Sequence, residues 1–491
     1  MVSAKKPDTI RGPTPQMQSL RHLNIVSNLS RMPRQKTPMN PVERRTVASL
    51  AFIYALRMLG LFLLLPVISV ASRDLAGSTP ALMGLALGIY GLTQAIFQIP
   101  FGYLSDRFGR KPIITLGLVI FALGSVVAAL STTIHGVILG RALQGAGAIA
   151  AAIMALVADL TREQQRTKAM ASIGGSIGLS FMLALVLGPI LEARYGLQGL
   201  FWITAVAALL ALPVLWWFTP GAINVSRTGD VRFERRRFAG LLKDARLIRF
   251  DIGIFALHMA LTAFFIVVPL QLVDRFEMPV GEHWKLYIPV LIASVVGMLP
   301  ILIIAHRGGR YPSMMMVSIA LMILAQLVFG LSGATFWMLV AGLWLFFIGF
   351  NALEAMLPSL ISRLAPAGAK GTVMGVYNSF EFAGIFVGGL LGGWLFGLYG
   401  TLGVYLLTAA ALGVWLVLVF TSPPLNLLQS VTLRLKEGNE HEPDALLAML
   451  MKLPGVRDGT VMPEQSLVYL KVESREFDAA GLREIPGITM V

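Results

Sequence analysis

Long apolar stretches alternate with short polar segments from about residue 46 to residue 420. A bilayer core requires roughly 20 consecutive apolar residues per helix. We predict twelve transmembrane helices, at 46–70, 80–104, 112–130, 134–158, 167–191, 197–218, 250–273, 283–305, 311–330, 336–360, 370–396 and 400–420. The predicted fold class is therefore an all-α polytopic membrane protein.

The segments outside these stretches divide the chain further. Residues 1–45 are polar and basic and lack the apolar run of a signal peptide, so we expect a disordered cytoplasmic tail. The basic segment 219–249 is the longest connection, and it separates two halves of six helices, at 46–218 and 250–420. Apolar residues among its arginines favour an amphipathic helix on the membrane surface.

Residues 430–491 have the mixed pattern of a small α+β domain. The pattern predicts strands near 431–435, 456–461, 467–472 and 488–491, and helices at 446–453 and 477–485. This order, β-α-β-β-α-β, is typical of a ferredoxin-like fold. Metal-binding versions of the fold use two cysteines, which this chain lacks, so a binding or regulatory module is the better interpretation.

Composition and charge placement support a membrane location. Of the 491 residues, 56% are hydrophobic and only 13% are charged, whereas soluble proteins have about a quarter charged. The net charge is +14, but the basic residues gather in alternate short loops, so we expect no nucleic-acid partner. Such loops stay in the cytoplasm, which predicts that both termini lie there and that basic loops face anionic lipid.

These features together predict a multi-pass, monomeric protein of the bacterial inner membrane. The absence of cysteine excludes disulfides, thiolate metal sites and cysteine nucleophiles. We expect no cofactor and no metal.

Small residues recur four positions apart within several predicted helices. The pairs are Gly84 and Gly88, Gly174 and Gly178, Gly388 and Gly392, and Gly393 and Gly397. This spacing lets helices approach closely, which suits either sliding contacts in a transporter or plain helix packing.

Two motifs connect the chain to a known family. Between the second and third helices the sequence reads Gly102-Tyr-Leu-Ser-Asp106-Arg107-Phe-Gly109-Arg110-Lys111-Pro112, which resembles the loop signature of the major facilitator superfamily. In the fourth helix, Gly140-Arg141-Ala-Leu-Gln144-Gly145-Ala-Gly147 resembles the family's second signature, which is associated with proton coupling. Gly188-Pro189 in the fifth helix is similar to part of the antiporter signature.

The resemblance covers about residues 40–420. It implies a non-enzymatic transporter of two six-helix halves. The segments around Arg57, Gln94, Gln144 and Asn351, together with the appended α+β domain, resemble the YajR-type proton-coupled transporters of this superfamily. The expected partners are protons and a small-molecule substrate.

The loop motif also predicts a conformational latch. Asp106 ends the second helix and Asp159 ends the fourth on the same predicted side, where Arg110 can reach both. The eleventh helix begins on the same side, at about residue 370, and the dipole at its N-terminus would stabilise the Asp106 carboxylate. The predicted latch residues are Gly102, Asp106, Arg107, Gly109, Arg110 and Asp159. The alternative is that the arginines only set topology.

Five ionisable residues lie inside the predicted spans: Arg57, Arg141, His258, Glu354 and Glu381. Charges at membrane depth are costly and usually face a cavity or a partner. The resemblance implies that the helices of the first four line a central cavity. At about 1.5 Å per residue, His258 lies about 12 Å and Glu354 about 9 Å from the cytoplasmic end, so the two are within reach of each other.

A carboxylate and an imidazole can both take up and release a proton. We predict that Glu354 carries the coupled proton and that Glu381 is the second candidate. Arg57 and Arg141 would hold an anionic substrate group or repel a second proton. The alternative is a structural ion pair, or a residue that reaches out from a helix end.

The sequence leaves several functions open. The favoured hypothesis is proton-coupled efflux, by antiport, of a small organic molecule. A symporter or uniporter of the same fold is an alternative, and so is a membrane receptor that signals through residues 430–491. Deleting that domain would separate the last case, because a transporter would still move its substrate.

Overall fold

The computed structural model describes most of the helical part, residues 38–221, 244–331, 335–366 and 370–422, and much of the C-terminal part. In the C-terminal part it describes 429–435, 443–462, 467–473, 476–477, 482, 485 and 488–490. Residues 1–37 of the predicted tail, 222–243 of the predicted linker and most of the predicted helix 477–485 lie outside the described residues.

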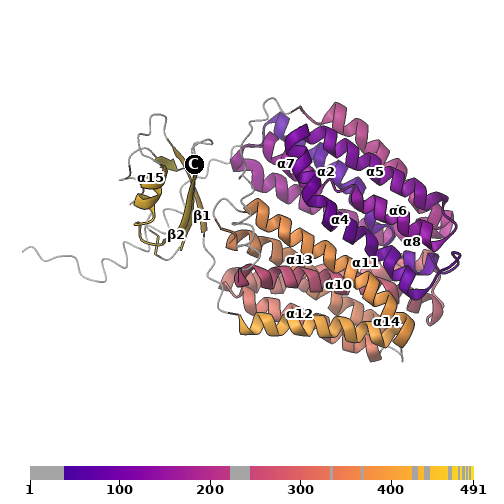
Figure 1. Ribbon diagram of the computed structural model, residues 1–491. Coiled ribbons are helices and arrows are strands. Elements are labelled where there is room, and N and C mark those ends of the chain that lie inside the picture. The colour runs from indigo at the N-terminus through magenta and orange to yellow at the C-terminus, as the bar shows by residue number, and fades with distance from the viewer. Residues whose placement is uncertain are drawn as a thin grey trace, which may run out of the picture.

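The N-terminal half is built from helices that run back and forth along one bundle (Figure 1). These are α2 (Pro41–Phe62), α3 (Ile68–Ala71), α4 (Pro80–Phe108), α5 (Arg110–Leu130), α6 (Ile134–Ala146), α7 (Ala150–Leu160), α8 (Glu163–Pro213) and the π-helix η1 (Val214–Phe218). The C-terminal half contains α10 (Ala245–Asp274), η2 (Val280–Glu282), α11 (Trp284–Gly308), α12 (Tyr311–Leu331), α13 (Phe336–Leu364) and α14 (Lys370–Thr421).

Within the described residues, ten helical stretches are long and apolar enough to cross a membrane. Two of them contain a break, since α8 has a non-helical glycine at Gly196 and α14 has one at Gly400. Both glycines have positive φ, at 65° and 63°, a conformation that residues with a Cβ rarely adopt. Each break divides one long helix into two spanning segments, which confirms the predicted all-α fold of twelve spans.

Two helices differ in detail from the sequence prediction. The first, α2, begins at Pro41, inside the predicted tail, because Asn40 and Glu43 form a capping box around its first turn. It ends at Phe62, and the chain then turns through residues 63–67 before α3. The predicted helix 134–158 is divided into α6 and α7 by Gly147-Ala148-Ile149.

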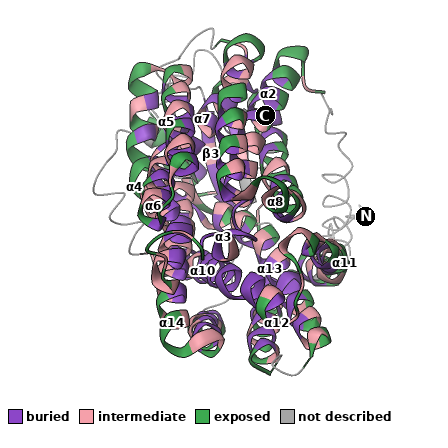
Figure 2. Cartoon of the chain, turned by 90° about the vertical axis from the view of Figure 1, so that its right-hand side faces the viewer, coloured by how far each residue is buried: buried purple, intermediate pink, exposed green. Residues whose placement is uncertain are grey.

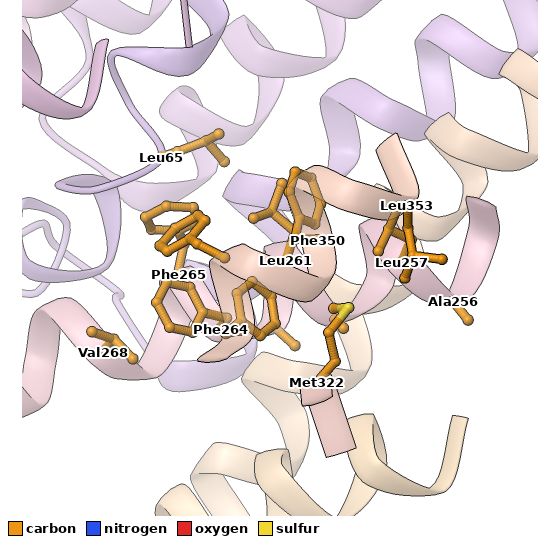
Figure 3. Close-up of a cluster of buried hydrophobic side chains, with 14 of the residues drawn as sticks. Leu65, Ala256, Leu257, Leu261, Phe264, Phe265, Val268, Met322, Phe350 and Leu353 are labelled. Carbon is orange, nitrogen blue, oxygen red and sulfur yellow. The ribbon is translucent and has the colours of Figure 1, made fainter. Parts of the chain in front are cut away.

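The largest buried apolar cluster joins both halves, a second lies mainly in the N-terminal half, and apolar side chains also cover the outside. Figure 2 shows that α10 is almost entirely buried. Figure 3 shows side chains of α10, including Phe264 and Phe265, in one apolar cluster with Phe350 of α13. Trp217, Trp337 and other large apolar residues are exposed on the periphery, as expected where lipid is the solvent.

Helix α14 packs closely against both halves through glycines. Between α4 and α14, a Cβ at Gly84 of α4 would lie 2.2 Å from the Gly389 carbonyl oxygen of α14. A Cβ at Gly393 of α14 would lie 2.8 Å from the Gly84 Cα. Opposite α10, a Cβ at Gly388 would lie 2.4 Å from the Met259 carbonyl oxygen. Close approach is therefore confirmed for these predicted small-residue positions.

The other predicted pairs contribute less. A Cβ at Gly397 would make only ordinary contact with Pro80, at 3.4 Å. At Gly174 and Gly178 a Cβ would meet nothing within 4 Å among the described residues, so close helix packing is not seen at these two positions.

The C-terminal part forms a small α+β domain with its own core. It contains β1 (Gln429–Leu435), α15 (Pro443–Leu450), β2 (Val456–Met462), β3 (Leu467–Val472) and β4 (Ile488–Met490). The four strands are antiparallel in the order β2-β3-β1-β4. This is the ferredoxin-like arrangement predicted from the order of elements.

The small domain lies beyond one end of the helical bundle (Figure 1). Its Lys471 Nζ donates to the Arg363 carbonyl oxygen at 2.9 Å, at the last turn of α13. The end of α4 at Asp106 lies at this end of the bundle, which we call the Asp106 end. The opposite end, with the loop before α4, is called the Arg73 end.

We predict that Gly84→Ala lowers the free energy of unfolding by about 1–3 kcal/mol, because a methyl group would be forced onto the α14 backbone. Thermal unfolding of the purified protein in detergent measures the effect. Gly178→Ala is the matched control, since its Cβ would enter open space. Equal unfolding temperatures for the two variants would contradict the packing argument.

Candidate functional site

Three titratable side chains of the C-terminal half lie near the middle of the bundle. His258 on α10 and Glu381 on α14 form a pair, with Nε2 3.5 Å from Oε1. Glu354 on α13 interacts electrostatically with Glu381, and its Oε2 is buried with no hydrogen-bond partner among the described residues. The sequence placed His258 and Glu354 within reach of each other, and the partner that the structure gives to His258 in this conformation is Glu381.

Helix packing explains why Glu381 is the partner of His258. Helices α10 and α14 approach through Gly384 against the Phe255 carbonyl oxygen, and through Gly388 against Met259. The two contacts lie four residues apart on each helix, so α10 and α14 run side by side in the same direction. This packing brings Glu381 to the face of α10 that carries His258. Helical side chains point back toward the N-terminus, so the His258 ring points toward the level of Glu381. Its Nδ1 lies 3.3 Å from the Ile254 carbonyl oxygen.

Arg57 lies in the core of the N-terminal half. Its Nη2 donates to Gln94 Oε1 at 2.6 Å and to the Gly147 carbonyl oxygen at 3.0 Å. The Gly147 carbonyl is at the break between α6 and α7, where helical partners are missing. Nε and Nη1 of Arg57 have no partner among the described residues, and the side chain lies near the rings of Tyr90 and Phe121.

Arg141 lies near the same tyrosine. Its Nη1 donates to Gln144 Oε1 at 2.9 Å, and Gln144 donates in turn to Ser125 Oγ at 2.8 Å. The guanidinium lies 5.0 Å from the centre of the Tyr90 ring. Arg57 and Arg141 are each 1% exposed, so in this conformation neither of these predicted cavity residues reaches solvent.

Aromatic residues join the acid-bearing half to the arginine-bearing half. The Tyr90 ring contacts the ring of Phe382, the residue after Glu381, at 6.5 Å between centroids. Phe181 of α8 stacks on Phe350 of α13 at 6.4 Å. Tyr54, one turn before Arg57, interacts electrostatically with Glu381. The titratable group therefore lies beside the boundary between the halves.

The structure brings three of the six predicted latch residues together, Asp106, Arg110 and Asp159. Arg110 pairs with Asp106, and its Nε donates to Asp159 Oδ2 at 3.0 Å. Arg107 is exposed and lies against the ring of Phe108, and Gly109 has φ 95° at the turn between α4 and α5. Gly102 lies one turn before Asp106, where an added Cβ would be in ordinary contact with Ala151, at 3.5 Å.

All of the latch contacts seen in this conformation lie within the N-terminal half. The Asp106 side chain is 63% exposed, so it remains accessible to a second partner. On α14, Gly371 and Gly375 face open space, as Gly174 does on α8. Among the described residues, no atom packs within 4 Å of a Cβ at these positions.

The Arg73 end is closed by contacts between the halves. Arg73 forms a two-pronged pair with Asp274, with Nη1 to Oδ1 at 2.7 Å, and Ser69 Oγ donates to the Phe265 carbonyl oxygen at 3.1 Å. Hydrogen bonding to Asp274 raises the pKa of Arg73, so the pair stays ionised near neutral pH. These contacts thus join the two halves at the Arg73 end.

Sequence reasoning missed two further residues near the acids. Asp251 on α10 is 4% exposed, and its Oδ1 has no hydrogen-bond partner among the described residues. The buried Tyr377 hydroxyl interacts electrostatically with Glu354, Glu381 and Asp251. An acid just inside a predicted span was the available signal for Asp251. No cluster of metal-ligating side chains occurs in the described part of the chain.

Comparison with known proteins agrees with this geometry. The sequence profile described as Major Facilitator Superfamily matches residues 50–299 and 251–438. The chain therefore belongs to the major facilitator superfamily and is a membrane transporter. Within it, the chain is 43% identical over 437 residues to the inner membrane transport protein YajR of Escherichia coli (strain K12), covering 89% of this chain and 96% of that protein.

More distant relatives share the fold. Multidrug resistance protein MdtH of Klebsiella pneumoniae (strain 342) is 27% identical over 352 residues, covering 69% of this chain and 83% of that one. Among solved structures, a bacterial homologue of the human lysosomal transporter Spinster, described as inward-facing and occupied, matches with a TM-score of 0.61. It is 15% identical and covers 78% of this chain and 97% of that chain, a likeness of fold alone.

We predict that Asp274→Arg opens the Arg73 end, because the Arg73–Asp274 attraction becomes a repulsion. Ser69→Cys provides the reporter, since Ser69 is 1% exposed and the chain has no other cysteine. Losing an exposed pair of about 0.2–1 kcal/mol should raise the rate of labelling by a water-soluble thiol reagent up to about fivefold.

Adding Arg73→Asp to Asp274→Arg should restore slow labelling, since the swapped charges attract again. Glu282→Arg is the matched control, because Glu282 pairs with Lys285 at the same end but within one half. Equally fast labelling in this control would show that the Arg73–Asp274 pair does not hold the halves together.

Proposed function

We propose that this transporter is a proton-coupled antiporter that exports a small organic molecule from the bacterial cytoplasm. The observation that carries the proposal is the titratable group at the boundary between the halves, where His258 pairs with Glu381 and Glu354 lies close by. Charge at membrane depth is costly and is usually functional. The names of YajR and MdtH support an inner-membrane location and a role in export.

The proposed topology places the Asp106 end and both termini in the cytoplasm. Lys and Arg are concentrated in the loops of that end, among them Arg107, Lys111, Arg307 and Arg310. In this orientation Arg73 and Asp274, whose pair joins the two halves, lie on the outer side. The tail 1–45 before the first half (46–218), the linker 219–249 between the halves and the domain 430–491 after the second half (250–420) are then all cytoplasmic.

The proposed cycle alternates access between the two ends while a proton moves on the acids. With the Asp106 end open, substrate enters from the cytoplasm, and the halves then rock about the midplane. Glu354 is suited to carry the proton, because a charged carboxylate is costly where its oxygen has no partner. Glu381 lies beside His258 and could pass a proton to it, so the three side chains Glu354, Glu381 and His258 could alternate between two protonation states.

We predict that Glu354→Gln abolishes transport driven by a pH gradient but leaves substrate counterflow largely intact, since glutamine keeps the shape and cannot titrate. His258→Ala should shift the pH optimum. Proton flux per substrate in proteoliposomes, measured with drug-like candidate substrates, tests both variants. If Glu354→Gln stays coupled and Glu381→Gln does not, the proton is carried by Glu381. If both stay coupled, the proposed function fails.

We also propose that the Asp106–Arg110–Asp159 cluster is the latch that holds the Asp106 end closed in the other conformation. Asp106 would then accept from the first turn of α14, which begins at Lys370, and an acid at a partly buried helix N-terminus contributes up to about 2 kcal/mol.

We predict that Asp106→Asn weakens this closed state by up to that amount and shifts the population toward an open Asp106 end. Distances between spin labels on α4 and α14 measure the two populations. Asp74→Asn, an exposed acid at the Arg73 end, is the control. An unchanged distance distribution in Asp106→Asn would rule out the latch.

A further inference from the structure

A groove on the outer face of the N-terminal half has features that the transport cycle does not use. It lies between α2 and η1 and has a volume of about 290 Å³. Arg45, Ala48, Ser49 and Phe52 of α2 and Val214 and Phe218 of η1 line it. The α2 positions recur at helical spacing, so they form one continuous face about two turns long.

The rim of the groove carries two cations that converge on one helix end. Arg45 donates from Nε to the Phe218 carbonyl oxygen and from Nη2 to that of Trp217, both at 2.7 Å. Lys111 Nζ donates to the next carbonyl, that of Thr219, at 2.6 Å. Three consecutive carbonyls at the end of η1 therefore hold a guanidinium and an ammonium side by side.

Three arginines near this end of the bundle have acidic partners, and these two cations do not. Arg110 pairs with Asp106 and Asp159, Arg162 pairs with Glu43, and Arg246 pairs with Asp244. Among the described residues, neither Arg45 nor Lys111 forms an ion pair with a carboxylate. The carbonyls at the end of η1 carry only partial negative charge, so the two adjacent cations keep a net positive charge that attracts an anion.

The groove has the polarity of a phospholipid. Its cationic rim lies at the Asp106 end, and from there it runs past Ala48 to Phe52, toward the middle of the bundle, with apolar walls. Trp216 and Trp217 are exposed beside the cations, as expected at the level of lipid headgroups. Its volume is at the lower end of the range for small-molecule pockets, and its open side suits a single acyl chain.

We propose that this groove binds one anionic phospholipid, with the phosphate at Arg45 and Lys111 and an acyl chain between α2 and η1. Charge complementarity selects the anionic headgroup, and the apolar wall selects a lipid over a free anion. Since η1 is the last turn before the predicted linker, a bound lipid would connect the first and last helices of the N-terminal half where the chain leaves the bundle.

Native mass spectrometry of the full chain in detergent tests the proposal. The lipids are phosphatidylglycerol and phosphatidylcholine with identical acyl chains, and inorganic phosphate is added in a separate arm. We expect one phosphatidylglycerol to bind more tightly than phosphatidylcholine, and inorganic phosphate not to displace it. Arg45→Gln and Lys111→Gln should each weaken phosphatidylglycerol binding about fivefold, the effect of one basic residue near an anionic lipid.

Three variants keep the test falsifiable. Arg45→Lys retains the charge and should retain the preference, which separates lipid binding from the capping of η1. Ala48→Phe fills the groove and should weaken both lipids alike. Arg44→Gln is the matched control, because Arg44 is the exposed neighbour of Arg45 and does not line the groove; it should leave binding unchanged.

The opposite results would overturn the proposal. An Arg44→Gln effect as large as that of Arg45→Gln would mean diffuse attraction to the basic surface. Displacement by inorganic phosphate would mean a simple anion site. Equal binding of both lipids, or binding unaffected by Ala48→Phe, would mean that no anionic lipid occupies this groove.

Discussion

The close contact of α14 with two other helices is the constraint on which much of this structure depends. One face of α14, with Gly384 and Gly388, lies against the α10 backbone, and another, with Gly389 and Gly393, lies against α4. Because no side chains intervene, α14 touches both halves of the transporter at once. It also carries Glu381, so the titratable group and the boundary between the halves share one rigid element.

The sequence predicted the architecture well because hydrophobic length is a strong signal in a membrane protein. Twelve spans and a ferredoxin-like domain follow from apolar runs and from the order of strands and helices. The helix ends were less predictable. The start of α2 depends on the capping of Asn40 by Glu43, and the break between α6 and α7 is stabilised by a side chain from another helix, Arg57. Apolar periodicity contains no information about such contacts.

The site was predictable as a set of residues but not as a set of partners. Intramembrane charge identified His258, Glu354 and Glu381 from the sequence alone, since each is costly unless it has a role. Counting residues along a helix gives depth but not the direction in which a side chain points. The pairing of His258 with Glu381 depends on the register of α10 and α14, which glycine contacts far along the sequence determine. Tyr377 gave no signal because tyrosine is common in membrane helices.

The glycine breaks at Gly196 and Gly400 have a consequence for how the halves are related. Each occurs between the last two spans of its half, and each replaces a loop by a single residue with positive φ. The two halves therefore repeat one construction, as expected for a protein built from duplicated units. In each unit the final helical hairpin has almost no slack at its turn. A displacement of the first helix of the hairpin therefore moves the second helix with it. We expect the last two helices of each half to move together, in the same way in both halves.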